Sequence, residues 1–492
     1  MVVSSTAEAT QAGLQILKMG GNAIDAAAAT AFALMVTDPA MCSLGGRSQT
    51  LIYLKNGEIV GIDGATQSPS NVEEPARIGH GYKTVAIPGS PAALEKMINL
   101  YGTLPLKTIL QPAIKLAKEG FEINEEYHTA FREYGKHFRS YPGSAKYFLK
   151  QNGDFYSKGE ILKQPALANT LQNMANNGCG VLYRGQMASH IISDMKCNDG
   201  LITDNDLAQY KARTGEILKG AYKGYDIITR GDQCDGGSVI EMLHILAKFN
   251  ISEYFKDQSQ YIPLIARILH IGYLDEMLPD EVQVSDETAT RRAKELHFAQ
   301  AKKAPLQLEE KYDEGETNHL AVIDEDGNAV SLTQSIGPNF GSKVANPDLG
   351  FFYAYSYDMN DAPVPLQREK TSQSPTILLK DGKPVVVLGS AGSNRIPGSI
   401  VQSIINYIDH KMTPEQAIAY PRVFYFGNQL HLEHFALDEP VKASLDQLDF
   451  SVKNYFQLNG WFGRVQAIFV DTNENKIIGV SDPRDNGAAM GL

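Results

Sequence analysis

A small set of hydroxyl-bearing residues in the second half of the chain has the types and spacing needed for nucleophilic chemistry. Thr317 precedes one apolar run, and Thr333 and Ser335 lie two residues apart in a second run. Residues two apart in a strand lie on one face, so both hydroxyls can lie beside Thr317 if the two runs pair. If the bond between Glu316 and Thr317 were cut, Thr317 would have a nucleophilic hydroxyl and a free α-amine to act as its base.

The surrounding residues predict the hairpin that would position these hydroxyls. The runs beginning at Leu320 and Ala329 are separated by the turn residues Asp-Glu-Asp-Gly-Asn at 324–328, which is a strong hairpin signal. A calcium loop is the alternative for this turn, but the closing glutamate is missing. His319 alternates onto the face of Thr317 without an obvious carboxylate partner, which favours packing over general-base function.

The stretch from Thr317 to Gly341 resembles the nucleophile motif of the γ-glutamyltranspeptidases. The chain has T-N-H-L-A-V-I-D-E-D-G-N-A-V-S-L-T-Q-S-I-G-P-N-F-G, and the family pattern is close to T-[ST]-H-x-S-V-x-D-x-x-G-N-A-V-S-x-T-x-T-I-N-x-x-F-G. The match is gapless and departs at Asn318, Ala321, Ser335 and Gly337. Ser335 keeps a hydroxyl where the family has the threonine that hydrogen-bonds the nucleophile, whereas Gly337 replaces an asparagine used near the substrate.

The resemblance implies an α+β fold, the four-layer αββα sandwich of the N-terminal nucleophile (Ntn) hydrolases, with additional helices. It also implies cleavage between Glu316 and Thr317. The products would be a large segment, residues 1–316, and a small segment, residues 317–492, that together form one αββα unit. Residues 303–316 are rich in Lys, Glu and Asp, which predicts a solvated and mobile end of the large segment. The similarity runs from end to end and is weakest in the middle.

Further site residues follow from the same resemblance. Gly392 and Ser393, in the loop G-S-A-G-S-N-R-I, fall where the family has the two backbone N–H donors that stabilise the tetrahedral intermediate. A glycine-rich helix entry is the alternative for this loop. Thr371 and Ser372 match a serine pair that hydrogen-bonds the substrate carboxylate, and Asp358 matches the first of two aspartates near the substrate amine.

The residues that would clamp a glutamyl group depart from the family pattern. Ala65 stands where the family has the arginine that pairs with the α-carboxylate, and Met359 stands where it has the aspartate that holds the α-amine. A methyl group cannot replace a bidentate guanidinium. Arg47, which replaces a family glycine, could bind a carboxylate from another direction; a structural arginine is the alternative.

The leading hypothesis is therefore a self-processing threonine hydrolase or acyltransferase. It would cleave γ-glutamyl amides such as glutathione through an acyl-enzyme and pass the acyl group to water or an amino acid. One alternative is an acylase for a dicarboxylic or other acyl amide, and another is an unprocessed homologue without activity. The expected partners are a small amide or peptide substrate and the protein's own second fragment, and further oligomerisation is left open.

Composition narrows the class further. The 492 residues are 43% hydrophobic and 21% charged, which is typical of a globular protein, and a net charge of −12 argues against nucleic-acid or anionic-membrane partners. No apolar run reaches the roughly 18 residues of a membrane span, and no signal peptide is visible, so we expect a cytoplasmic protein unless a leader precedes it. Cys42, Cys179, Cys197 and Cys234 form no metal-binding spacing, and we expect neither a metal nor a cofactor.

The rest of the sequence predicts the elements around the hairpin. We expect two helices within 5–36, and strands at 49–54 and 59–62 that belong to the second sheet of the sandwich. The middle, 125–300, is expected to be helical. A later hairpin at 375–388, a helix at 400–408 and strands at 465–470 and 476–480 complete the chain.

Overall fold

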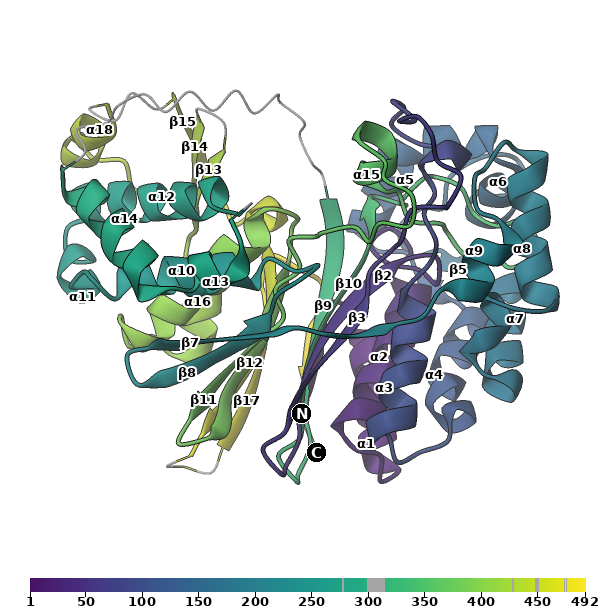
Figure 1. Cartoon of the computed structure of the whole chain (residues 1–492), viewed down its shortest axis with the longest axis horizontal. Coiled ribbons are helices and arrows are strands. Elements are labelled where there is room, and N and C mark those ends of the chain that lie inside the picture. The colour runs from purple at the N-terminus through teal and green to yellow at the C-terminus, as the bar shows by residue number, and fades with distance from the viewer. Residues whose placement is uncertain (277, 299–314, 427–428, 447–450, 473, 475) are drawn as a thin grey trace.

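The computed structural model describes residues 1–276, 278–298, 315–426, 429–446, 451–472, 474 and 476–492. Two β-sheets face each other, and helices cover the outer face of each sheet, as Figure 1 shows. This arrangement confirms the predicted αββα sandwich. Most of the predicted acidic segment, up to residue 314, lies outside the described residues.

The first sheet has seven strands and contains the predicted hairpin. In spatial order they are β18 (Ala488–Met490), β1 (Val2–Ser4), β9 (Gly315–Ile323), β10 (Ala329–Pro338), β2 (Arg47–Tyr53), β3 (Ile59–Gly64) and β6 (Arg213–Gly215). The expectation that the strands near 49–62 belong to the second sheet is wrong, because β2 pairs directly with β10 from Ala329 opposite Tyr53 to Ser335 opposite Arg47. Every residue of β2 is buried, so its sequence could not indicate which sheet it joins.

Helices cover the outer face of this sheet. They include α1 (Ala7–Lys18), α2 (Ala23–Thr37), α3 (Ser90–Tyr101), α4 (Leu106–Glu119), α7 (Pro165–Asn177) and α8 (Gln186–Cys197). α2 is buried along its whole length and is capped at its N-terminus by Asn22, which forms a capping box with Asp25. The two helices predicted within 5–36 are thereby confirmed.

The second sheet has six strands with its own helical cover. The strands are β17 (Lys476–Ser481), β16 (Arg464–Asp471), β12 (Lys383–Ala391), β11 (Thr376–Lys380), β8 (Tyr225–Arg230) and β7 (Ile217–Tyr222); the helices include α10 (Gly236–Leu246), α12 (Gln258–Leu274), α14 (Asp286–Phe298) and α16 (Arg395–Ile408). The helical prediction for 125–300 is therefore wrong at β5 (Ile161–Leu162), β6, β7 and β8. The turn between β7 and β8 has positive φ at both Lys223 (49°) and Gly224 (84°), and this Lys-Gly pair was the overlooked hairpin signal.

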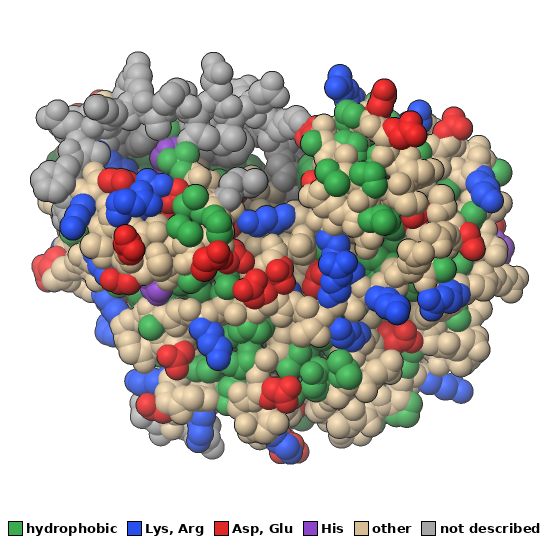
Figure 2. Space-filling model, in the orientation of Figure 1, with side chains coloured by type: hydrophobic (Ala, Val, Ile, Leu, Met, Phe, Trp, Pro, Cys, Tyr) green, Lys and Arg blue, Asp and Glu red, His purple; other side chains and the backbone are tan. Residues whose placement is uncertain are grey.

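The remaining elements are short or peripheral. They are α5 (Glu125–Tyr134), α6 (Pro142–Phe148), α9 (Asp204–Gln209), α11 (Ile251–Tyr254), α13 (Asp280–Gln283), α15 (Tyr357–Asp361), α17 (Pro414–Ala419), α18 (Glu439–Asp446), β4 (Phe121–Glu122), β5 (Ile161–Leu162), β13 (Val423–Phe426), β14 (Gln429–Glu433) and β15 (Ser451–Tyr455). Acidic and basic side chains are interspersed over the face shown in Figure 2. Within the described ranges, no helix combines the length and apolar character that crossing a membrane requires.

The packing between the two sheets determines where Thr317 points. Ala321 and Ile323 of β9 pack in the core between the sheets, together with Val387 of β12 and Ile468 of β16. Because strand residues alternate between faces, Thr317 directs its side chain toward the same space between the sheets. It lies near the start of β9, where that space reaches the edge of the sandwich.

Candidate active site

Thr317 and Ser335 lie directly opposite each other on β9 and β10. Both backbone groups of Ile323 bond to Met1, the N–H at 3.0 Å and the carbonyl at 2.9 Å, so the odd-numbered residues of β9 direct their backbone groups away from β10. Thr317 and Ser335 therefore form a non-hydrogen-bonded pair, the arrangement that brings facing side chains closest. Both are buried, with exposed fractions of 5% and 4%.

A β-bulge fixes the hydroxyl of Ser335. The register of β10 shifts between Ser335 and Gly337, and the Gly337 N–H donates to Ser335 Oγ at 2.9 Å. Gly337 has φ +90°, and a Cβ built there lies 2.9 Å from the Tyr355 carbonyl oxygen and 3.4 Å from Arg47 Nη2. A side chain at position 337 would therefore collide with the Tyr355 carbonyl and crowd the Arg47 guanidinium, so the glycine at 337 leaves the space that Arg47 occupies.

Thr333 lies one pair deeper and has a different neighbour. Its Oγ1 lies 2.9 Å from Nδ1 of His319, which is directly opposite. The His319 ring is fully buried against Gly389, and burial lowers its pKa to about 3, so it is neutral. This environment favours the predicted packing role of His319, and it places Thr333 against that ring rather than beside Thr317.

A pocket of about 440 Å³ lies beside Thr317 and brings most of the predicted site together. Its lining residues are Arg47, Thr317, Ser335, Gly337, Tyr357, Glu369, Lys370, Thr371, Ser372, Gln373, Ser393 and Ile396. Thr371 donates both its N–H and its hydroxyl to the Gln233 carbonyl, at 2.9 and 3.2 Å, and Ser372 Oγ donates to Asn394 Oδ1 at 2.9 Å. Thr333, Asp358 and Gly392 are not among the lining residues.

The loop of Gly392 and Ser393 joins β12 to the N-terminus of α16. Both residues have positive φ, 127° and 52°, and Arg395 N–H bonds to the Gly392 carbonyl at 3.0 Å. The N-terminal end of a helix carries a partial positive charge and backbone N–H groups without partners inside the helix, and both stabilise a negative charge that develops nearby. For Ser393, a left-handed conformation costs about 1 kcal/mol relative to glycine.

A buried ion pair forms one wall of the pocket, and sequence reasoning identified only its arginine. Arg47 Nη1 pairs with Glu369 Oε2, and each side chain is 4% exposed. The carboxylate also accepts from Thr66 Oγ1 and from the Tyr357 N–H, both at 2.8 Å. Glu369 lies 322 positions from Arg47 in the sequence, and nothing in its Arg-Glu-Lys context indicated a contact with that residue.

Asp358 lies on α15 next to this pair. Burial and the nearby Glu369 carboxylate raise the pKa of Asp358 to about 6, and the Arg47 guanidinium partly offsets them. Ala65 is fully buried and donates its N–H to Asp63 Oδ1 at 2.8 Å, so it contributes no side-chain group to the pocket. Arg47 is therefore the arginine that lines the pocket shared by Thr317 and Ser335.

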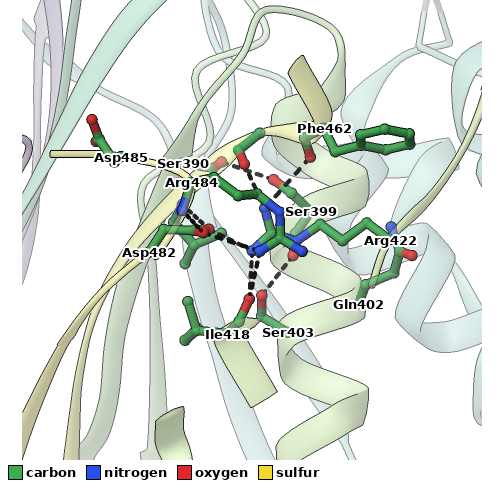
Figure 3. Close-up of polar contacts among 12 residues, drawn as sticks. Ser390, Ser399, Gln402, Ser403, Ile418, Arg422, Phe462, Asp482, Arg484 and Asp485 are labelled. Carbon is green, nitrogen blue, oxygen red and sulfur yellow. Dashed lines mark hydrogen bonds and ion pairs between the residues drawn. The ribbon is translucent and has the colours of Figure 1, made fainter. Parts of the chain in front are cut away.

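A buried polar network holds the loops around the site. Ser399 on α16 donates to Ser390 at the end of β12, at 2.8 Å. Asp482 accepts from Arg422 at 2.7 Å and from Arg484 at 3.0 Å, and all three side chains are at most 1% exposed. Figure 3 shows this network, with Asp485 following directly after Arg484. These contacts fix α16 and the chain that follows β17.

These features define the class of protein. Two stacked sheets between helical layers, with a threonine near the start of a central strand that opens into a polar pocket, are the architecture of an Ntn hydrolase. A structure of cephalosporin acylase from Bacillus halodurans superimposes with a TM-score of 0.88 at 27% identity, covering 99% of this chain and 94% of that chain.

Sequence comparisons give the family. The family model described as Gamma-glutamyltranspeptidase matches residues 9–492. A Glutathione hydrolase proenzyme of Escherichia coli (strain K12) is 31% identical, over 98% of this chain and 90% of that protein. An Acylase ACY 1 proenzyme of Pseudomonas sp. (strain SE83) is 32% identical, over 90% of this chain and 86% of that protein. The chain belongs to the γ-glutamyltranspeptidase family and is an enzyme of the Ntn-hydrolase type.

Proposed function

We propose that the protein cleaves its own chain between Glu316 and Thr317, and that Thr317 then acts as the nucleophile of an amidase or acyltransferase. The observation that carries this proposal is the position of Thr317, which lines the pocket opposite Ser335 and shares it with Ser393. The names of the Escherichia coli and Pseudomonas relatives describe proenzymes, which supports processing in this chain as well.

The two products would stay together as one heterodimer. In the seven-stranded sheet, β9 from Thr317 onward and β10 belong to the small segment and lie between β1 and β2 of the large segment. In the second sheet, β11 of the small segment pairs with β8 of the large segment. Separating the fragments would break strand pairing in both sheets, so cleavage changes the active site without dissociating the fold.

The proposed mechanism uses groups that lie around the pocket. The α-amine of Thr317 takes the proton of its hydroxyl as the oxygen attacks the substrate carbonyl, and Ser335 orients that hydroxyl. The backbone N–H groups of Gly392 and Ser393 stabilise the oxyanion. The leaving amine departs with the transferred proton, and water or an amino acid then attacks the ester carbonyl and releases Thr317.

For the substrate, we propose γ-glutamyl amides such as glutathione. A glutamyl head group has a carboxylate and an ammonium on one carbon, and the pocket wall presents Arg47 and Glu369 with matching opposite charges. Asp358, next to this pair, would add to the attraction for the ammonium. The Thr371 and Ser372 hydroxyls would bond the carboxylate by exchanging their present hydrogen bonds to the Gln233 carbonyl and to Asn394 Oδ1 for bonds to the substrate. The alternative is a dicarboxylic acyl group, which lacks the ammonium, and the acylase relative from Pseudomonas supports it.

Two chromogenic anilides that differ only in that ammonium test the substrate. The proposal predicts that γ-glutamyl-p-nitroanilide has a higher kcat/KM than glutaryl-p-nitroanilide by at least about tenfold, which corresponds to about 1.4 kcal/mol. The reverse order would establish the acylase alternative. Rapid acid quench and mass spectrometry should show one acyl group on the fragment that begins at Thr317, and acyl addition elsewhere would contradict the nucleophile assignment.

A further inference from the structure

A second pocket touches Thr317 from the opposite side of β9. It has a volume of about 270 Å³, and its lining residues are Ser5, Thr6, Asp38, Met41, Asn124, Glu126, Tyr127, Thr317, Arg464, Asp485 and Asn486. Thr317 is the residue that lines both this pocket and the one that holds Arg47 and Ser335. The proposed mechanism uses none of its other residues.

The strand geometry shows which atom of Thr317 faces this side. β1 pairs with β9 only as far as Ser4 opposite Leu320, so the first residues of β9 have no β1 partner. The odd-numbered residues of β9 direct their backbone groups toward the β1 side, as the Ile323–Met1 bonds show, and the pairing with β10 stays regular from Ile323 to Thr317. The backbone nitrogen of Thr317, which becomes the α-amine after cleavage, therefore points beyond the end of β1, where this pocket lies.

Negative charge predominates in this pocket. Glu126 forms an ion pair with Arg464 at 2.7 Å, which balances one of the three carboxyl groups. Asp38 and Asp485 remain, and no second Lys or Arg is among the lining residues named above. Burial raises the pKa of both to about 7. The charges of Asp485 and Glu126 add to the rise at Asp38, whereas at Asp485 the Arg464 guanidinium opposes the rise and Glu126 adds to it.

Hydrogen bonds hold both carboxyl groups in place. Asp38 ends α2 and accepts from the Tyr127 hydroxyl at 2.5 Å and from Asn318 Nδ2 at 3.0 Å. Asp485 accepts from Gln466 Nε2 at 2.9 Å and follows Arg484 of the buried network in Figure 3. In the uncleaved chain the backbone nitrogen of Thr317 is part of a neutral amide. Cleavage would turn it into a basic amine that faces the carboxyl groups of Asp38 and Asp485.

We propose that Asp38 and Asp485 are positioning residues that hold the α-amine of Thr317 and stabilise its protonated form during the reaction. The inference rests on the proposed cleavage at Thr317. When the amine takes the hydroxyl proton it becomes an ammonium, and the carboxylates balance that charge until the proton passes to the leaving amine. No bond to either aspartate forms, and the proton count is unchanged. The arrangement parallels the aspartate that stabilises the imidazolium of a catalytic triad.

The test replaces each carboxyl by an amide of the same shape, Asp485→Asn and Asp38→Asn. Without a nearby carboxylate the ammonium loses its proton more readily, so its pKa falls by about one unit or more. The acidic limb of the kcat/KM–pH profile should move to lower pH by the same amount. Reductive methylation of the Thr317 α-amine, followed by mass spectrometry of the small fragment, should show the same shift without depending on turnover.

Controls separate this inference from the proposed function. Glu122→Gln, an exposed carboxylate on β4, should leave both profiles unchanged. Cleavage should still occur in both aspartate variants, because the amine that they hold exists only afterwards. A variant with the wild-type melting temperature that is not cleaved, or is cleaved with an unshifted profile, overturns the inference and leaves Thr317 as the nucleophile. An uncleaved wild-type protein overturns both.

Discussion

The buried pair of Arg47 and Glu369 gives a prediction that concerns both stability and specificity. Replacing Glu369 by glutamine removes the charge opposite Arg47 and leaves a single acceptor oxygen. The Thr66 hydroxyl and the Tyr357 N–H bond to different oxygens of the carboxylate, so the glutamine keeps only one of these two bonds. Breaking a buried pair from one side costs about 3–5 kcal/mol. Because this pair lines an open pocket, we expect Glu369→Gln to lower the free energy of unfolding by about 3 kcal/mol, the low end of that range.

The effect on specificity follows from the same charge. Two unit charges about 5 Å apart interact by about 3 kcal/mol at an effective dielectric constant of about 20. If half of that attraction for the substrate ammonium reaches the transition state, its loss changes kcat/KM about tenfold. Glu369→Gln should therefore lower the preference for γ-glutamyl-p-nitroanilide over glutaryl-p-nitroanilide by about tenfold, because Arg47 still attracts the carboxylate that both substrates share.

The assays are thermal unfolding and initial rates on the two anilides. Glu74→Gln, an exposed carboxylate in the loop after β3, is the matched control and should alter neither the melting temperature nor the substrate ratio. A Glu369→Gln protein with an unchanged substrate ratio would refute the assignment of this pair to acyl recognition. An unchanged melting temperature would refute the claim that Glu369 balances a buried charge.

Three further perturbations test other parts of the site. Ser335→Ala removes the hydroxyl opposite Thr317 and should slow both cleavage, followed on gels, and kcat by about 10–100-fold, whereas Thr333→Ser should change kcat less than threefold. Ser393→Gly relieves the strain of the positive φ and should raise the free energy of unfolding by about 1 kcal/mol. The glycine keeps the backbone N–H, so a large fall in kcat would contradict the assignment of that N–H as the oxyanion donor. His319 has a pKa of about 3 in the folded protein and near 6.5 in the unfolded chain, so between these pH values the unfolded chain binds more protons. The free energy of unfolding therefore falls as the pH decreases through this window, by up to about 1.4 kcal/mol per pH unit. Melting temperatures of wild type and His319→Gln from pH 7 to pH 4 should diverge accordingly, and parallel curves would contradict the buried neutral ring.

The nucleophile hairpin was predictable because its signals are local. The Asp-Gly turn and the two apolar runs predict that the two strands pair, and the two-residue spacing predicts that Thr333 and Ser335 share one face. The spacing could not tell that Thr333 faces His319 while Ser335 faces Thr317. Which of the two hydroxyls lies opposite Thr317 depends on the register between β9 and β10, and the spacing within β10 does not set that register.

Contacts between distant parts of the chain were harder to predict. Nothing near β2 indicates that it pairs with β10, although Tyr53 lies opposite Ala329, 276 positions further along the chain. A fully buried strand lacks the alternation that marks a face. Glu369 was missed because only the fold brings it to Arg47, and Asp38 and Asp485 were missed because they approach Thr317 from two ends of the chain. Site residues within one motif can be identified from sequence, whereas those that complete the pockets depend on the packing of the sheets.

The central claim is that Thr317 becomes an N-terminal nucleophile, and the intact mass of the purified protein tests it most directly. Wild type should give two masses, one for a fragment that ends at Glu316 and one for a fragment that begins at Thr317. Thr317→Ala should give the single 53.9 kDa chain. One uncut mass for both proteins, or equal cleavage in both, would contradict the account.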